Sequence, residues 1–254
     1  MESAIFGQAI REYLRPKRLA PWIMLAVVCL LLAFVWVKLD PTSTAESRYS
    51  TVSSMLVFRL LALASAIFTT AIISQEVEQK TIVYLLTRPV PRWKLLLIRY
   101  IASVVVVALL GILAAFLTSF GAYHGAGSNP LLSNDIMALV IGAFAYGALF
   151  LFVSLLFNRA LIICALFAFG WEASMPNMPG EMYRLSIFSY LQAIAEHPSD
   201  GDNKGLSLLT GSASDNVLTR GSSIFTLGIL VVVMLALSAW WFTKFEYVPR
   251  EDAE

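Results

Sequence analysis

Long apolar stretches alternate with short polar segments along most of the chain. A membrane core about 30 Å thick requires roughly 20 helical residues, because each residue of an α-helix advances by about 1.5 Å. Five stretches reach that length, and a shorter one lies before the last. The pattern predicts a single-domain, all-α integral membrane protein with six transmembrane helices. The predicted spans are 19–39, 50–74, 95–121, 135–158, 160–195 and 222–243.

The predicted fifth span differs from the others. Its uncharged part, 160–171, rises only about 18 Å as a helix, and it is followed by Glu172, Pro176 and Pro179. Broken backbone at membrane depth is tolerated only where protein or a water-filled cavity satisfies its polar groups. Either the membrane is locally thinner here, or the helix breaks and the chain re-enters the membrane; we expect the second, followed by a polar external loop over 196–221.

The first 18 residues carry one apolar stripe at helical spacing, with polar residues on the other faces. This pattern is typical of a helix that lies in the membrane interface. The alternative is a soluble helix packed on its own chain. The stripe consists of Ile5, Phe6, Ala9, Ile10, Tyr13 and Leu14.

A charged segment, 75–92, separates the predicted second and third spans. Its apolar positions recur at helical spacing, which indicates an amphipathic helix. Pro89 and Pro91 end that helix, because proline cannot continue the hydrogen-bond ladder and restricts the residue before it. Basic residues beside a span can serve simply to fix its orientation, but that role does not account for Glu76 and Glu78. We interpret the segment as a surface helix on which a partner can act.

The same segment carries the sequence pattern of a known family. It reads Glu76-x-Glu78-x-x-Thr81, followed by Tyr84-Leu85-Leu86-Thr87-Arg88-Pro89-Val90-x-Arg92. This pattern resembles the first cytoplasmic loop of ABC-2 type transporter permeases, which are the membrane subunits of ATP-binding cassette exporters. One departure is Lys80, which occupies a position where the family often has glycine.

The resemblance implies a mechanism and a set of partners. In that family the segment is a coupling helix that docks into a groove on a separate ABC ATPase, and the ATPase binds ATP and Mg. The permease works as a homodimer, or as a dimer with a similar permease, bound to two ATPase subunits, and periplasmic or accessory subunits are compatible with this assembly. The N-terminal helix corresponds to the family's connecting helix, and the region after 171 to re-entrant outer helices that cap the exit side. The residues to which the resemblance gives an ATPase-coupling role are Glu76, Glu78, Thr81, Tyr84, Arg88 and Arg92.

Composition and charge agree with a multi-pass membrane protein. Of the 254 residues, 58% are apolar and only 14% charged, whereas a globular domain has about 25% charged residues. Twelve of the 18 Lys and Arg residues lie in segments on the N-terminal side of the predicted topology, five lie on the other side, and Arg59 lies in a span. This bias places both termini in the cytoplasm, so we predict a cytoplasmic (inner) membrane protein. A net charge of +1 gives no indication of a nucleic-acid partner.

Motifs for enzymatic chemistry are absent from the sequence. It has no phosphate-binding G-x-x-x-x-G-K-[ST] loop, no H-E-x-x-H and no G-x-S-x-G, so we predict no enzyme, no metal site and no cofactor in this chain. His124 and His197 lie in predicted external loops, where we expect them to be solvated. Cys29 and Cys164 lie in apolar runs, where we expect buried, inert thiols.

Two charges fall within predicted spans. Arg59 lies nine residues into the second span, and Glu172 lies at the outer end of the fifth. Charges at this depth are expensive and suggest function or pairing. Arg59 could instead extend its side chain toward the membrane surface, and Glu172 could stabilise the broken helix. A direct pair of the two would account for both.

The predicted function is the permease subunit of an exporter that moves a substrate, with an amphiphile weakly favoured, using ATP hydrolysed by the partner. Two alternatives stay open: a carrier or channel that works without ATP, and an accessory membrane anchor of a complex. Small residues in the fourth span, Ala143 and Gly147, would allow close helix packing.

Overall fold

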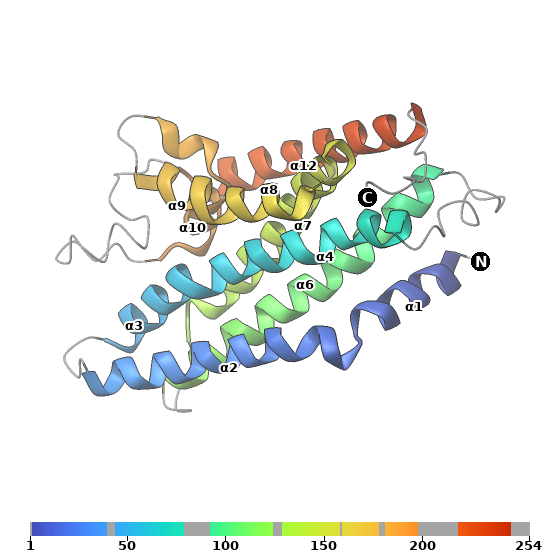
Figure 1. The fold of residues 1–254 in the computed structure, drawn as a ribbon. Coiled ribbons are helices and arrows are strands. Elements are labelled where there is room, and N and C mark those ends of the chain that lie inside the picture. The colour runs from blue at the N-terminus through green and yellow to red at the C-terminus, as the bar shows by residue number, and fades with distance from the viewer. Residues whose placement is uncertain are drawn as a thin grey trace.

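The computed structural model describes residues 2–39, 44–78, 92–123, 129–157, 159–177, 181–197 and 218–244. Every regular element in these ranges is a helix, which confirms the all-α prediction. The long helices lie side by side as one elongated bundle, with α1 at one end (Figure 1). The principal helices are α1 (Glu2–Tyr13), α2 (Pro16–Leu39), α3 (Ala45–Val52), α4 (Phe58–Glu78), α6 (Arg92–Ala122), α7 (Leu132–Leu156), α8 (Ala160–Leu166), α9 (Glu172–Ser174), α10 (Ile187–Ala195) and α12 (Arg220–Lys244).

Five helical stretches among the described residues are long and apolar enough to cross a membrane. The chain is therefore a multi-pass membrane protein. A shorter apolar stretch, Ala160–Ser174, occupies the first part of the predicted fifth span and does not reach that length. The five long stretches are Pro16–Leu39, Ala45–Ile72, Trp93–Ala122, Leu132–Leu156 and Arg220–Lys244.

Helix α7 lies at the centre of the bundle and packs against α4, α6, α10 and α12. Its small residues let the neighbouring helices approach closely. A Cβ atom at Gly142 would lie 2.8 Å from side-chain carbons of both Leu61 and Leu191. Gly147 faces Tyr100 and Val104 of α6, so the close packing predicted for this span occurs within the chain.

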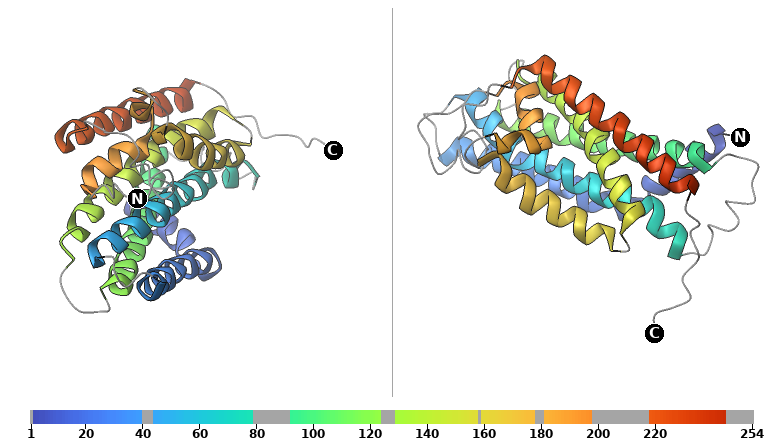
Figure 2. Two further views of the ribbon diagram at one scale, coloured as in Figure 1. Left: turned by 90° about the vertical axis from the view of Figure 1, so that its left-hand side faces the viewer. Right: turned by 90° about the horizontal axis from the view of Figure 1, so that it is seen from above.

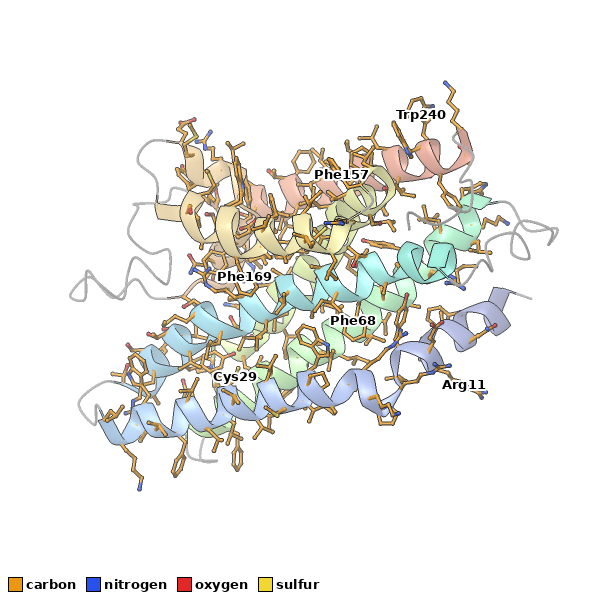
Figure 3. All side chains as sticks on the ribbon, viewed as in Figure 1. Arg11, Cys29, Phe68, Phe157, Phe169 and Trp240 are labelled. Carbon is orange, nitrogen blue, oxygen red and sulfur yellow. The ribbon has the colours of Figure 1, made fainter. Side chains whose placement is uncertain are left out.

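Helices α2 and α12 lie on opposite outer sides of the bundle (Figure 2). Both are largely exposed, and their apolar side chains suit contact with lipid or with another membrane protein. On its inner side α2 carries Trp22 and Cys29, both buried. Phe68 of α4 lies between α4 and α2, with its ring centroid 5.9 Å from that of Trp22 (Figure 3).

The apolar stripe of α1 packs on the chain itself. Ala9 and Tyr13 are buried, and the ring of Tyr13 meets the ring of Phe68 edge to face at 5.8 Å. Helix α1 also contacts α6. At least this part of the stripe is therefore packed on the chain itself. The location of α1 in the membrane interface stays a prediction.

The contact between α2 and α6 depends on a glycine near the end of α6. A Cβ atom at Gly121 would lie 2.8 Å from the backbone oxygen of Leu30 and 3.0 Å from the Cβ of Ala33. The first of these neighbours belongs to the backbone of α2 and cannot move aside as a side chain can. Gly228 of α12, in contrast, has nothing within 4 Å of such a Cβ atom.

We predict that Gly121→Ala lowers the free energy of unfolding by about 1–3 kcal/mol, the usual cost of overpacking. The matched change Gly228→Ala adds the same methyl group to an exposed helical position, where alanine is favoured over glycine by about 0.5–1 kcal/mol. Thermal unfolding of the two variants in the same detergent measures the difference. Equal melting temperatures would contradict the tight α2–α6 contact.

Candidate functional site

The chain from Ala160 to Ala195 is an interrupted helical stretch at one side of the bundle (Figure 1). Helix α8 continues through a π-helical segment, Phe167–Trp171, into α9 and then into a 3-10 turn, Met175–Asn177. A second 3-10 turn, Met182–Leu185, leads into α10. The interruption leaves the first N–H groups of α10 without partners inside their own helix.

Glu172 satisfies these N–H groups. Its carboxylate accepts hydrogen bonds from the backbone nitrogens of Ile187 at 3.1 Å and Phe188 at 3.0 Å, and from the Ser186 hydroxyl at 2.6 Å. The Ser186 hydroxyl oxygen in turn accepts from the nitrogen of Ser189 at 3.3 Å. Glu172 is only 3% exposed. A buried anion at a helix N-terminus is favourable because the N–H groups point at it and the helix dipole is positive there.

Two further side chains converge on the same place. The guanidinium of Arg59 lies over the ring of Phe188, 5.3 Å from its centroid, and interacts electrostatically with Glu172. The hydroxyl of Tyr146 is another hydrogen-bond partner of the Glu172 carboxylate. Helices α4, α7 and α9 thus meet at the start of α10 through buried or half-buried polar groups. We call this set (Arg59, Tyr146, Glu172 and Ser186) the Glu172 cluster.

The two membrane-depth charges share a local feature. Arg59 comes two residues after a π-helical segment, Ser53–Val57, and Glu172 comes directly after the π-helical segment Phe167–Trp171. Single π-helical turns inside α-helices are rare and are frequent at functional sites. The placement of both charges beside such turns supports a functional interpretation of the cluster.

A second buried acid, which the sequence analysis did not single out, lies at the start of α7. Asp135 is fully buried. Its Oδ2 accepts from the hydroxyls of Tyr49 at 2.7 Å and Ser53 at 2.6 Å, and its Oδ1 lies 2.7 Å from Nε2 of His197. We call these four residues the Asp135 cluster.

The prediction that His197 is solvated is wrong. Its side chain is only 8% exposed, and its ring packs against the rings of Tyr49 and Phe58. The reason is a sharp turn after α10, where Glu196 adopts the left-handed conformation with φ 53°. A buried carboxylate needs such a partner, because an unpaired charge away from water is very costly. His124, the other predicted loop histidine, lies outside the described residues.

The comparison with protein families supplies the assignment. A family model described as ABC-2 family transporter protein matches residues 12–190. The chain belongs to the ABC-2 transporter family. The match includes α2 to α9 and the first four residues of α10, so both acidic clusters except His197 lie inside it. Among curated proteins none matches the chain.

Membership in the ABC-2 family establishes a coarse role. The chain is the membrane component of an ABC transporter, a typically non-catalytic subunit that associates with an ABC ATPase. In the described residues no group of three or more His, Cys, Asp or Glu side chains could hold a metal ion. Cys29 and Cys164 are both buried and unpaired, as their apolar surroundings predicted.

Half of the six ATPase-coupling residues predicted for this ABC-2 chain lie outside the described residues. Glu76 and Glu78 belong to the last turn of α4 and Arg92 is the first residue of α6, and for these three the helical backbone alone is described. The end of α4 and the start of α6 lie at the end of the bundle where α1 lies (Figure 1). The remaining predicted coupling residues, outside the described ranges, are Thr81, Tyr84 and Arg88.

The geometry also changes how a pair of Arg59 and Glu172 can be tested. Exchanging the two charges would place a cation against the N–H groups of Ile187 and Phe188, which require an acceptor. The exchanged protein would therefore fail whether or not the two side chains form a pair in the native protein. Single changes at Glu172 are more informative.

We predict that Glu172→Ala is strongly destabilising. It leaves two backbone N–H groups and the hydroxyls of Ser186 and Tyr146 without their acceptor, at about 1–3 kcal/mol for each group that stays unsatisfied. Glu172→Gln retains one acceptor oxygen and should lie between the alanine variant and wild type. Thermal unfolding of the purified variants provides the ranking.

Glu181→Ala is the matched control for this ranking. Glu181 lies close in the chain and forms an exposed ion pair with Arg184 at 3.4 Å, and an exposed pair contributes less than about 1 kcal/mol. If Glu172→Ala were no less stable than Glu181→Ala, the carboxylate would not be what holds the start of α10.

Proposed function

We propose that this chain is the permease subunit of an ABC exporter and moves its substrate outward across the cytoplasmic membrane. The energy comes from ATP hydrolysed, with Mg, by two separate ATPase subunits. The family match over residues 12–190 carries the proposal. The largely exposed apolar faces of α2 and α12 are compatible with a second permease copy, and the apolar spans weakly favour an amphiphilic substrate.

We propose that both termini lie in the cytoplasm. Helix α1, the end of α4, the start of α6 and the end of α12 lie at one end of the bundle (Figure 1). That end carries several basic residues, as expected for the cytoplasmic side; they are Arg11, Arg15, Lys17, Arg18 and Lys244. The stretch from α8 to α10 would then complete a sixth, broken crossing, with re-entry on the outer side.

The mechanism that we propose is mechanical. Helix α4 runs without interruption from Phe58 to Glu78, a length of about 30 Å at 1.5 Å per residue. One end carries Glu76 and Glu78 of the proposed coupling segment, and the other carries Arg59 of the Glu172 cluster. A displacement imposed by the ATPase at the first end would reach the start of α10 through this helix. Coupling further requires that ATPase contacts differ in free energy between two states of the permease.

We predict that the triple variant Glu76→Ala/Glu78→Ala/Arg88→Ala loses its ATPase partner. Removing three charges from the proposed docking helix weakens an interface whose charges set orientation and association. The measurement is affinity purification of the tagged permease in mild detergent, with the ATPase identified by mass spectrometry. We expect the ATPase to accompany wild type and to be reduced at least about tenfold in the variant, equivalent to about 1.4 kcal/mol.

The matched control removes two acids and one base at the opposite end of the bundle: Glu46→Ala/Glu181→Ala/Arg184→Ala. These side chains are exposed, so the control should retain the ATPase. Equal loss in both triple variants would point to general damage rather than docking. Absence of any ATPase from wild type would favour the carrier or the membrane-anchor alternative.

A further inference from the structure

The imidazole of His197 has two nitrogens in different situations. Nε2 lies 2.7 Å from Oδ1 of Asp135. Nδ1 is buried and has no hydrogen-bond partner among the described residues. With one proton on the ring, the contact to the carboxylate places that proton on Nε2, because a carboxylate accepts and does not donate. The lone pair of Nδ1 is then left without a donor.

A second proton would bind to the imidazole at Nδ1, because its lone pair is not engaged in a hydrogen bond. Histidine is the side chain whose unperturbed charge change falls between about pH 5 and 8. The Asp135 carboxylate, in direct contact, supplies the negative charge that an imidazolium needs in a buried place. We propose that Asp135 and His197 form a proton-binding site at the end of the bundle opposite α1. The proton comes from a hydronium ion: one of its O–H bonds breaks and leaves water, a new N–H bond forms at Nδ1, and the added charge is offset by Asp135.

The charged and titratable neighbours of the site are few among the described residues. The hydroxyl of Tyr49 in α3 also donates to the Asp135 carboxylate. Tyr123, beyond the end of α6, interacts electrostatically with Tyr49. Glu196, next to His197, lies 3.7 Å from Arg220 of α12, so these two charges offset each other. Phe58 at the start of α4 presents an apolar ring to His197. Asp135 is thus the acid in direct contact with the imidazole.

Proton uptake at this site acts on α10. His197 follows the C-terminal end of α10, and Glu172 holds its N-terminal end. The ring of Phe58 contacts both His197, at 5.8 Å between centroids, and Phe188, at 6.3 Å. An imidazolium whose Nδ1–H has no acceptor is costly when buried. Protonation therefore favours an arrangement in which Nδ1 reaches water, and this loosens the C-terminal anchor of α10.

The test uses the small number of histidines. The full chain has two, so His124→Gln leaves His197 as the sole histidine. The protein is labelled with ¹⁵N-histidine, reconstituted in lipid bilayers and observed by ¹⁵N NMR from about pH 5 to 8. We expect one protonated and one unprotonated ring nitrogen at the upper end and two protonated nitrogens at the lower end. An imidazole in the same state throughout this range would overturn the proposal.

Two variants in the same background separate a proton site from a purely structural contact. Asp135→Asn removes the carboxylate charge that favours the imidazolium, so the change should move to lower pH. Tyr49→Phe removes one hydrogen bond to the carboxylate and leaves its charge, so a clear two-state change should persist. A transition that does not move in Asp135→Asn would mean that Asp135 takes no part in proton binding at His197, and it would contradict the proposal. The spectrum of the His124→Gln protein keeps the cluster intact, so the central test stands even if Asp135→Asn does not fold.

Discussion

A helix that breaks inside a bilayer exposes backbone N–H groups that lipid cannot satisfy. In this chain the first N–H groups of α10 have acceptors, because the Glu172 carboxylate accepts from two of them and from the Ser186 hydroxyl. Desolvating a carboxylate is expensive, but several charge-assisted hydrogen bonds and the positive end of the helix dipole offset that cost. An amide could not fully replace the carboxylate of Glu172, because its NH₂ group would add a hydrogen-bond donor where the surrounding groups already donate and need an acceptor.

Helix α10 owes its position to buried acids near both of its ends. It has nine residues, fewer than an isolated helix needs to be stable in water. Its apolar face supplies part of its stability, since Leu191 and Ile194 are fully buried. The rest comes from Glu172 before its first turn and from the contact of His197 with Asp135 after its last.

The apolar pattern predicted the helical class and the long helices, because burial in lipid requires runs of about 20 apolar residues wherever a helix crosses. It also predicted an interrupted stretch after residue 171, because proline and charge interrupt such a run, and the re-entry of this stretch into the membrane stays a prediction. It did not reveal that the partners of Glu172 are backbone N–H groups, which have no side-chain signature. The contact between Asp135 and His197 was not predicted from the sequence for a related reason. They are 62 residues apart. The burial of His197 also depends on a left-handed turn at Glu196, which the sequence pattern does not predict. An acid in the first turn of a long apolar helix, with Tyr49 and Ser53 near the start of a preceding span, was the available signal.

The two clusters are connected through the segment that precedes α4. Ser53, the first residue of the π-helical turn Ser53–Val57, donates to Asp135, and Arg59, just after that turn, lies over Phe188 at the start of α10. From Arg59 to its C-terminal end α4 is regular, so in the mechanism that we propose a displacement at Glu76 and Glu78 would move this part as a rigid body. On the N-terminal side of Arg59, the hydrogen bond from Ser53 to Asp135 links the π-helical turn to α7. In the proposed mechanism the π-helical turn lies between the part of α4 that would move and the contact of Ser53 that anchors it, and π-helical turns are frequent at functional sites. Whether movement of α4 is absorbed there or passed on to Asp135 depends on the strength of the Asp135 contacts. Through those contacts the protonation state of His197 would set how firmly the end of the bundle opposite α1 resists that movement.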